Sequence, residues 1–585
     1  MNDPVQRRDY LWVAGFTILL FGIVLAAGGP LTLHEGVLSQ TTKAMLANQD
    51  WLVPRYGDAP WLERPPLPQW ISCAICTLIG ECDQEWNVRI GPALAGMLTV
   101  LITLWLAGRL FGRRVGIVSA LALATMYNFL RYSTLAEADI FLAPIVAAAI
   151  AFFAYAEIVR FLPAESETPP APEPPPESIN PVGARPWCVL GFFVMLGMTN
   201  LVKGLVFGTV IVLAAVGTFL VWNFSWRSIA RYCWLWGIVA FAAVALPWPL
   251  LVYQRFPDAA EVWHFDLFGR LNQHYLEEPA WYYFVCLTWV PQPWTIAAIA
   301  GLALSFKHLW RNGSPALRFV WCWAWMPLLV FSLSHGKHHH YMLHYLAPWA
   351  ILAAQGTLWA WDKVGEHWQK RWYIPLGIAI AGDVALAFIA RKIPGPDWTL
   401  PLLLTAFPLL VGGLWWFGFE RRPAVAVIGS FAMILLLYAG FFVYKGAYLH
   451  RSREDTAFLF EARKLVPPDQ PLMLNSADEA LEGLRMQYYI GDSVYFLHNL
   501  SFVRDDRIHT PDVYVVTRYN RLPQLEKYGT LEPLLKCKQA RRESSEADRW
   551  TLFRLHLRDD FERKSAAVRI SPMQAMYRHP GPDLD

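Results

Sequence analysis

Long uncharged apolar runs alternate with short polar or basic segments along most of the chain. Leu11–Pro30 and Gly204–Asn223, for example, contain no Asp, Glu, Lys or Arg. Each has about the 20 residues that a helix needs to cross the hydrocarbon core of a bilayer. The pattern predicts about 13 membrane spans. They fall near residues 11–30, 90–110, 115–132, 140–161, 187–203, 204–223, 233–253, 283–305, 317–334, 343–361, 373–390, 399–418 and 424–443.

Lys and Arg residues gather in alternate loops between these spans. With a cytoplasmic N-terminus, every short cytoplasmic loop is basic, as the positive-inside rule requires. An odd number of spans then places the C-terminal segment outside, on the same face as the long loop of residues 31–89. The basic cytoplasmic positions are Arg7, Arg8, Arg109, Arg113, Arg114, Arg227, Arg231, Lys307, Arg311, Lys363, Lys370, Arg371, Arg421 and Arg422.

Two segments break the membrane pattern. Residues 163–186 are rich in Pro and Glu, which cannot build a core and predict a disordered cytoplasmic linker. After Tyr444 the composition becomes that of a soluble domain. It predicts amphipathic helices at Asp455–Leu465 and Ala477–Tyr488, and short strands at Pro471–Asn475, Ser493–Leu497, Asp512–Thr517 and Trp550–Leu555.

The expected fold is therefore an α-helical polytopic membrane protein with a small extracytoplasmic α/β domain at its C-terminus. The predicted boundaries are residues 1–446 for the membrane domain, 447–557 for the α/β domain and 558–585 for an irregular tail. This matches the composition, because 55% of the residues are hydrophobic and only 17% are charged, against roughly 25% charged in soluble domains. The 29 Trp and 23 Tyr residues suit the two membrane interfaces.

Charge and cysteine usage exclude two other classes. A net charge of +3, scattered along the chain, does not predict nucleic acid as a partner. The eight Cys residues form no ligand-like cluster. Cys73 and Cys76 have the spacing of a redox pair, but they lie in an apolar run, so simple packing is the preferred interpretation.

Polar residues on the predicted outer face are candidates for chemistry. The first outer loop begins with His34 and Glu35 and continues through Glu63 and Arg64. A second loop carries Glu137 and Asp139 at the end of an apolar hairpin. Acids at this depth are costly and usually face a cavity or a partner. The alternative interpretations are an interfacial anchor for the first loop and a solvated turn for the second.

Three further patches on this face are basic. Lys203 lies between two apolar runs, where a Lys that merely snorkels to the interface is the alternative. His264 and Arg270 precede an aromatic cluster, and Lys337 precedes three consecutive His residues and Tyr341. Cations suit a phosphate-bearing lipid, and carboxylates can deprotonate an acceptor hydroxyl. One face of the membrane thus carries both halves of a transfer reaction.

These motifs also resemble a known family. The run HEGVLSQTTKAMLANQDWLVPRYGDAPWLERPPLPQW is similar to the first outer loop of bacterial membrane glycosyltransferases of the C-type fold, in particular the lipid A aminoarabinose transferases and the protein-mannosyltransferase-like enzymes. The runs AEADIFLAP, NLVKG, HFDLFGRL and SLSHGKHHHYMLHYLAP follow in the order of the family's motifs. The resemblance implies an enzyme of the bacterial inner membrane, with its active site outside and a role in modifying the cell envelope by lipid A modification or protein glycosylation.

The resemblance also implies partners and roles. The sugar donor would be a polyprenyl (undecaprenyl) phosphate sugar, and the acceptor a lipid, a glycan or a protein. Direct displacement with inversion would make the phosphate the leaving group, and fixed cations would stabilise its growing charge. The residues expected to bind that phosphate are Arg64, Lys203, Arg270, Lys337 and, through a hydrogen bond, Tyr341.

Two motifs depart from the family pattern. The family's Asp-Glu pair at the end of the first span reads His34-Glu35 here, so the catalytic carboxylate is expected to be Glu35 or Asp139, with His34 at the acid position. The His of an acidic-His-x-x-Arg motif is also replaced. A divalent metal cation would then be held by Glu63 together with a nearby His, either His264 or His274.

Two other function classes fit the sequence less well. A transporter or flippase of lipid-linked substrates is expected to place ionisable groups in mid-span and to show internal repeats, whereas these charges cluster at span ends. A catalytically inactive lipid-binding paralogue would explain His34. The motifs leave the sugar and the acceptor open.

Overall fold

The computed structural model describes most of the chain up to residue 368 and most of the C-terminal domain. The described ranges are 3–56, 59–159, 186–204, 206–264, 278–311, 314–334, 336–368, 454–468, 470, 472–475, 480–491, 494–496, 512–538 and 549–558. The predicted spans at 373–390, 399–418 and 424–443, the linker and the tail lie outside these residues.

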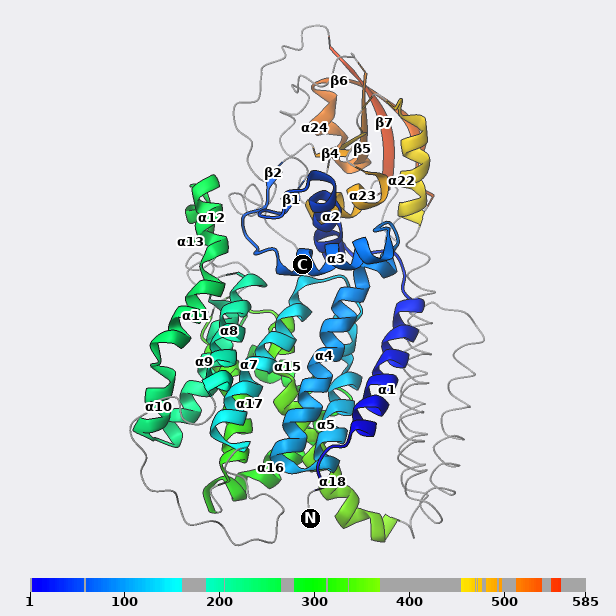
Figure 1. Cartoon of the computed structure of the whole chain (residues 1–585). Helices are drawn as coiled ribbons and strands as arrows, with labels where there is room; N and C mark the ends of the chain where they lie inside the picture. The colour runs from blue at the N-terminus through cyan, green and yellow to red at the C-terminus, as the bar shows by residue number, and fades with distance from the viewer. Residues whose placement is uncertain are drawn as a thin grey trace.

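Apolar helices form a bundle that occupies one end of the molecule (Figure 1). In chain order its larger helices are α1 (Arg7–Ala26), α2 (Leu33–Asn48), α3 (Leu67–Ile79), α4 (Glu85–Phe111), α5 (Arg113–Thr125), α6 (Tyr127–Ser133), α7 (Leu142–Glu157), α8 (Pro186–Met198), α9 (Phe207–Trp222), α10 (Trp226–Tyr232), α11 (Leu235–Ala245), α12 (Pro247–Arg255), α13 (Ala259–His264), α15 (Tyr282–Trp289), α16 (Thr295–Arg311), α17 (Pro315–Ser332) and α18 (Ala347–Trp368). Short 3₁₀ helices, η1 (Ala138–Phe141), η3 (Thr199–Leu201) and η5 (His339–Tyr345), precede α7, follow α8 and precede α18.

Within the described residues, five helical segments are long and apolar enough to cross a membrane, or six when the bent pair α5 and α6 is one span. Shorter apolar helices such as α3 and α9 accompany them. The prediction of a polytopic helical membrane protein is confirmed. The total of 13 spans stays a prediction, because the last three fall outside the described part of the chain.

Several predicted spans differ in detail for local reasons. The run 283–305 is split into α15 and α16 because Pro291 and Pro293 lie between them, and a proline removes a helical N–H donor. The loop of residues 31–89 begins with the helix α2, because Thr32 caps it in a reciprocal capping box with Glu35. α3 is an apolar helix inside what the sequence predicted as an outer loop.

Close helix contacts and aromatic side chains build the core of the bundle. α4 and α5 touch at Gly108 and Gly116, where an added Cβ on Gly116 would come within 2.9 Å of the Gly108 Cα. Phe153 of α7 lies against Phe192 and Phe319 with ring centroids 6.1 and 5.6 Å apart. This packing joins α4 to α5, and α7 to α8 and α17.

The C-terminal domain is a five-stranded sheet with helices. Its strands are β3 (Leu472–Leu474), β4 (Val494–Phe496), β5 (Asp512–Arg518), β6 (Gly529–Lys536) and β7 (Trp550–Leu557), and its helices are α22 (Glu454–Leu465), α23 (Ala480–Ile490), the short η7 (Tyr519–Arg521) and α24 (Leu522–Glu526). The order is β4-β3-β5-β7-β6, with β3 parallel to its two neighbours and the last two pairs antiparallel. The predicted helices and four strands are confirmed, and β6 was not predicted.

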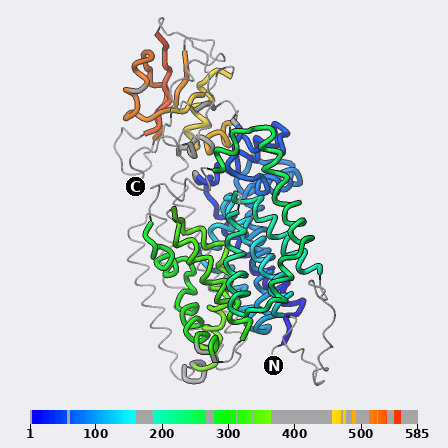
Figure 2. The backbone as a smooth tube through the Cα atoms, turned by 90° about the vertical axis from the view of Figure 1, so that its left-hand side faces the viewer, coloured from blue at the N-terminus to red at the C-terminus, as the bar shows by residue number. Residues whose placement is uncertain are grey.

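α23 packs on α2, so the C-terminal domain lies at the same end of the bundle as the first loop (Figures 1 and 2). That loop also holds a small antiparallel pair, β1 (Arg55–Tyr56) and β2 (Ala59–Pro60). The α2–α23 contact is close at Gly36, where an added Cβ would meet the Arg485 backbone nitrogen at 2.8 Å. The first loop and the C-terminal domain therefore share one face.

Candidate functional site

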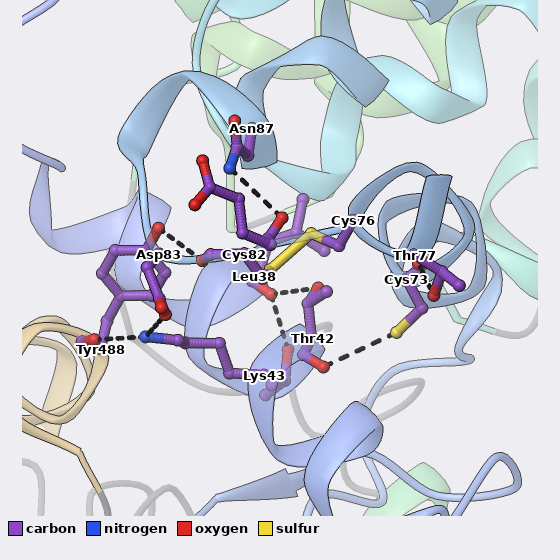
Figure 3. The surroundings of a disulfide bond; sticks show 12 residues. Leu38, Thr42, Lys43, Cys73, Cys76, Thr77, Cys82, Asp83, Asn87 and Tyr488 are labelled. Atoms are coloured by element: carbon purple, nitrogen blue, oxygen red, sulfur yellow. Dashed lines mark hydrogen bonds and ion pairs between the residues drawn. A yellow bond between two sulfur atoms is a disulfide. The ribbon is translucent and has the colours of Figure 1, made fainter. Parts of the chain in front are cut away.

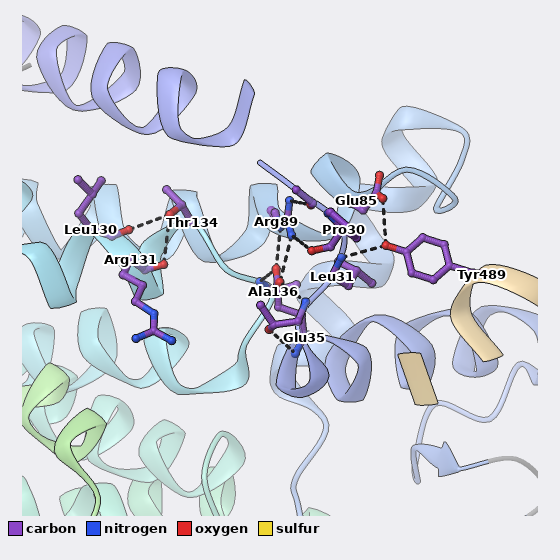
Figure 4. Close-up of polar contacts among 12 residues, drawn as sticks. Pro30, Leu31, Glu35, Glu85, Arg89, Leu130, Arg131, Thr134, Ala136 and Tyr489 are labelled. Carbon is purple, nitrogen blue, oxygen red and sulfur yellow. Dashed lines mark hydrogen bonds and ion pairs between the residues drawn. The ribbon is translucent and has the colours of Figure 1, made fainter. Parts of the chain in front are cut away.

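A buried ion pair between Glu35 and Arg89 joins the first loop to α4 (Figure 4). Arg89 donates from Nε to Glu35 Oε1 at 2.6 Å and from a terminal nitrogen to Oε2 at 3.0 Å. The Ala136 N–H also donates to Oε1, at 2.9 Å, and the Thr32 N–H donates to Oε2, at 2.8 Å. One carboxylate thus ties together α2, α4 and the segment that leads to Glu137.

The environment of Glu35 favours a positioning role over the predicted role as base. Its side chain is fully buried. Burial by itself would raise the pKa of Glu35, but the Arg89 charge, the Arg89 hydrogen bonds and the two backbone N–H groups outweigh it and hold that pKa below its usual range. A carboxylate stabilised in its charged form in this way is a weak proton acceptor. The geometry instead leaves Asp139, the other predicted carboxylate, next to a cation.

Asp139 and Lys203 form an ion pair where η1 meets the segment after η3. The Lys203 ammonium lies over two aromatic rings, 4.2 Å from the centroid of Tyr341 and 4.8 Å from that of Phe207. Lys203 is only 7% exposed, so its charge is stabilised by Asp139 and these two rings and not by water. Three segments far apart in sequence meet at this ammonium.

Arg64 lies beside the same lysine. Its guanidinium donates to the Lys203 carbonyl oxygen at 3.3 Å, and its side chain is half-buried. Lys337 is buried and donates to the Glu278 carbonyl oxygen at 2.7 Å. The structure thus brings Arg64, Lys203 and Tyr341 together. The hydrogen bond of Lys337 is made to Glu278, and Arg270 lies outside the described residues.

Glu137 precedes Asp139 in a segment rich in charge. Burial raises the pKa of Glu137 to about 8, and the neighbouring Asp139 and Glu35 carboxylates act in the same direction, against Arg131 and Lys203. A carboxyl group with such a pKa exchanges its proton near neutral pH. Glu137 is therefore the titratable acid of this site.

His34 keeps access to solvent at the start of α2. Crowding by protein atoms nevertheless lowers the pKa of His34, an effect that the nearby Asp139 carboxylate opposes and that Arg131 reinforces. His34 thus faces the acidic segment from the position where the family resemblance expects an acid.

Histidines from the 338–340 run close another side of the site. The Tyr132 hydroxyl and His339 Nε2 are 3.2 Å apart, and the His340 ring lies 5.9 Å from the Tyr132 ring. Burial, with a smaller contribution from Arg131, lowers the pKa of His339 to about 4, so the ring is neutral at physiological pH. These neutral rings supply hydrogen bonds and stacking surfaces without adding charge.

The metal site at Glu63 and His264 stays a prediction, although the residues next to them are in contact, since Trp263 Nε1 donates to the Leu62 carbonyl oxygen at 2.9 Å. Glu63 is buried and accepts a hydrogen bond from Trp61 Nε1 at 3.1 Å, whereas His264 is exposed at the end of α13. The described residues contain no group of three or more His, Cys, Asp or Glu side chains placed to hold a metal ion. Residues 265–277, which include His274, lie outside the described chain.

Three features of this end of the molecule were missing from the prediction. Arg89 could have been suspected, because it is a charge directly before the apolar run predicted as the span 90–110. Glu137 was noted in the sequence but not chosen over Asp139. The interpretation of Cys76 as simple packing is wrong, since it forms a disulfide with Cys82, whereas Cys73 is free and buried.

The chain is also similar in sequence to known proteins. Residues 63–160 match the family model described as dolichyl-phosphate-mannose-protein mannosyltransferase. The chain is 25% identical over 479 residues to an undecaprenyl phosphate-alpha-4-amino-4-deoxy-L-arabinose arabinosyl transferase of Shewanella sediminis, covering 78% of this chain and 80% of that protein. A protein of the same name from Pseudomonas paraeruginosa is 27% identical over 462 residues, covering 74% and 76%.

The solved structure of ArnT from Cupriavidus metallidurans bound to undecaprenyl phosphate has a similar fold. It superimposes with a TM-score of 0.68 at 17% identity, covering 93% of this chain and 97% of that one. The apo structure of the same protein gives a TM-score of 0.69. The chain therefore has the C-type fold of ArnT, and the predicted resemblance to membrane glycosyltransferases is confirmed.

Proposed function

We propose that this protein is an integral membrane glycosyltransferase that takes a sugar from a polyprenyl (undecaprenyl) phosphate donor. The observation that carries the proposal is the buried Lys203 ammonium, paired with Asp139 and flanked by Arg64 and Tyr341, on a chain with the fold of ArnT. The arabinosyl transferases that this chain resembles carry undecaprenyl phosphate aminoarabinose in their name, so an amino sugar donor is the first candidate.

The proposed reaction is direct displacement at the anomeric carbon. The bond to the phosphate oxygen breaks as the acceptor oxygen bonds to carbon, and the phosphate leaves with its electron pair. Lys203 and Arg64 stabilise the charge that grows on the phosphate, more in the transition state than in the bound donor. Asp139 holds the lysine in place, while Glu137, whose pKa is about 8, accepts a proton when the acceptor is a hydroxyl.

The proposed location is the bacterial inner membrane, with the site on the outer face. Helix α10, which carries Arg227 and Arg231, lies at the opposite end of the bundle from α2, as a cytoplasmic basic face requires (Figure 1). The Cys76–Cys82 disulfide lies at the site end, and disulfides persist in oxidising compartments such as the periplasm. A cysteine placed at exposed Glu526, in a background with Cys233 replaced by Ser, should react with a membrane-impermeant thiol reagent in intact spheroplasts. One placed at exposed Arg227 should not.

Release of polyprenyl phosphate tests the proposed reaction directly. Purified protein in lipid nanodiscs is given undecaprenyl phosphate aminoarabinose and a lipid A acceptor, and both products are quantified by mass spectrometry. Lys203→Met should bind undecaprenyl phosphate about 10- to 100-fold more weakly, because it removes a charged hydrogen-bond donor. Arg114→Met, which alters an exposed ion pair with Asp362 at the far end of the bundle, is the control and should behave as wild type.

His34 favours a second candidate, the inactive lipid-binding paralogue. The family resemblance expects an acid there, and Glu35 is engaged by Arg89. The same assay separates the two functions. If the protein binds undecaprenyl phosphate through Lys203 but releases no undecaprenyl phosphate from any sugar donor supplied, it is the inactive lipid-binding paralogue. If it neither binds undecaprenyl phosphate nor releases it from a donor, both proposed functions are wrong.

A further inference from the structure

A disulfide closes the short connection between α3 and α4, at the end of the molecule that carries the site (Figure 3). Cys76 lies near the end of α3, and Cys82 lies six residues further along, just before α4. Both are buried, at 2% and 8% exposure. The disulfide itself is therefore buried, although Gly80 and Glu81 of the loop that it closes are exposed.

The closed loop is a docking point for α23 of the C-terminal domain. The Tyr488 hydroxyl donates to the Cys82 carbonyl oxygen at 2.9 Å. Lys43 of α2 donates to the Tyr488 carbonyl oxygen at 2.9 Å and pairs with Asp83 at 2.7 Å. The same ammonium lies 4.5 Å from the Tyr488 ring centroid. Cys82 thus contacts Tyr488, and the next residue, Asp83, contacts Lys43, the lysine that binds Tyr488.

The neighbouring tyrosine continues this contact toward the site. The Tyr489 hydroxyl donates to Glu85 Oε1 at 3.0 Å and accepts from the Leu31 N–H at 2.9 Å (Figure 4). Glu85 begins α4, which carries Arg89 one turn later. Leu31 immediately precedes the cap of α2. Tyr489 therefore joins the two segments that hold Glu35 and Arg89.

The disulfide also belongs to the packing under the acidic segment. Cys76, Cys82, Tyr488 and Ala136 are members of one buried apolar cluster, together with Leu31 and Val88. The Ala136 N–H is bonded to Glu35, and the next residue is Glu137. A shift in the loop would be transmitted to this segment through direct contacts.

We propose that the Cys76–Cys82 disulfide and Tyr488 and Tyr489 are positioning elements for the transfer reaction. The disulfide holds the loop on which α23 docks, and the docked α23 holds the start of α2 and α4, and hence the segment of Glu137 and Asp139. This inference rests on the proposed function for its catalytic part. Its docking part stands on the contacts alone.

The expected size of the effect follows from loop closure. In the chain-entropy model, a disulfide across about seven residues favours the closed loop by about 50-fold. Because Tyr488 bonds to a backbone oxygen inside that loop, its docking shares in this preference. Removing the disulfide should therefore raise the population of undocked α23 by up to about 50-fold.

Hydrogen exchange in the full-length protein tests the docking part. Amide exchange of residues 480–490 is compared between wild type, the double variant Cys76→Ser/Cys82→Ser and the control Cys73→Ser, which alters a free buried cysteine on the same helix. Exchange should rise in the double variant and in fully reduced wild type, and stay unchanged in Cys73→Ser. Equal exchange in the double variant and wild type would overturn the proposal.

Transfer kinetics test the catalytic part, with Tyr489→Phe as a second variant that removes only a hydroxyl. Both Tyr489→Phe and the double cysteine variant should lose kcat at least about threefold, while binding of undecaprenyl phosphate stays within twofold of wild type. Faster exchange with unchanged kcat would refute positioning and leave a structural clamp. If wild type itself transfers no sugar, the proposed function fails and the catalytic part with it, while hydrogen exchange still decides the docking part.

Discussion

Replacing Glu35 and Arg89 singly and together distinguishes a positioning carboxylate from a base. Either single change leaves the other charge buried without its partner. Removing one member of a buried ion pair typically costs about 3–5 kcal/mol of unfolding free energy. Arg89→Met and Glu35→Gln are each expected to lose this much, because the guanidinium is 5% exposed and the carboxylate is fully buried.

The double variant Glu35→Gln/Arg89→Met removes both charges. It still loses the Arg89 bonds to the carbonyl oxygens of Gly29 and Pro30, at 3.0 and 3.4 Å, each worth about 0.5–1.5 kcal/mol. We expect it to be about 1–3 kcal/mol less stable than wild type. The double-mutant cycle then gives a coupling energy of at least about 3 kcal/mol.

Stability is measured by SDS titration of the purified protein in mixed micelles, and transfer is measured on the same samples. In the Glu35→Gln variants the amide oxygen can still accept from the Ala136 N–H, so the double variant should recover transfer along with stability. The reasoning is refuted if Glu35→Gln abolishes transfer at unchanged stability and the double variant does not recover it. That result would make Glu35 the base.

The pH dependence of the same pair has a fixed sign. The pKa of Glu35 in the folded protein lies below its usual range. Folding therefore favours the charged form, so the stabilisation is present above the ordinary pKa of 4.5 and is lost as the pH falls through the folded value. The difference in stability between wild type and the double variant should shrink on acidification below about pH 4.5.

Three other changes have defined outcomes. Glu137→Gln should gain stability over wild type steadily between pH 4.5 and about 8 and no further above it, because folding raises the pKa of Glu137 and deprotonation then opposes folding; thermal unfolding midpoints at pH 5 and pH 8.5 measure this, and an equal difference at both would contradict it. Asp139→Asn should weaken undecaprenyl phosphate binding less than Lys203→Met does but lower kcat at least about tenfold, since it releases the lysine it pairs with; unchanged transfer would remove Asp139 from the site. Gly36→Ala should speed amide exchange in residues 480–490, because its Cβ would lie 2.8 Å from the Arg485 nitrogen; Gly22→Ala, with nothing within 4 Å, is the control and should leave that exchange unchanged.

Local patterns in the sequence were sufficient for many, but not all, of the helices and strands of this protein. Apolar runs such as Gly204–Asn223 specify helices because a bilayer leaves the backbone no other partner than itself. The alternation of the Trp550–Leu555 run specified a strand in the same way, from its own residues. β6 was not predicted, because Glu532 and Pro533 interrupt its apolar pattern. It forms a strand through its antiparallel pairing with β7.

The candidate site was predicted only in part. The motifs placed Lys203 and Asp139 on one face, and the structure pairs them. They could not show that Glu35 is engaged by Arg89, because those residues are 54 positions apart and an ion pair depends on how α2 and α4 pack. A carboxylate is the same residue in the sequence whether it acts as a base or positions other groups.

What the sequence by itself determined is that the chain forms a helical membrane protein, and which residue types lie at the ends of its apolar runs, because hydrophobicity and charge act locally along the chain. Only the tertiary structure decided which of those residues meet. The Tyr488 hydroxyl bonds to the Cys82 carbonyl across 406 positions, and Cys76 pairs with Cys82, whereas the sequence favoured simple packing for Cys76. Such contacts depend on the packing of whole helices and of the C-terminal domain, which no local pattern records.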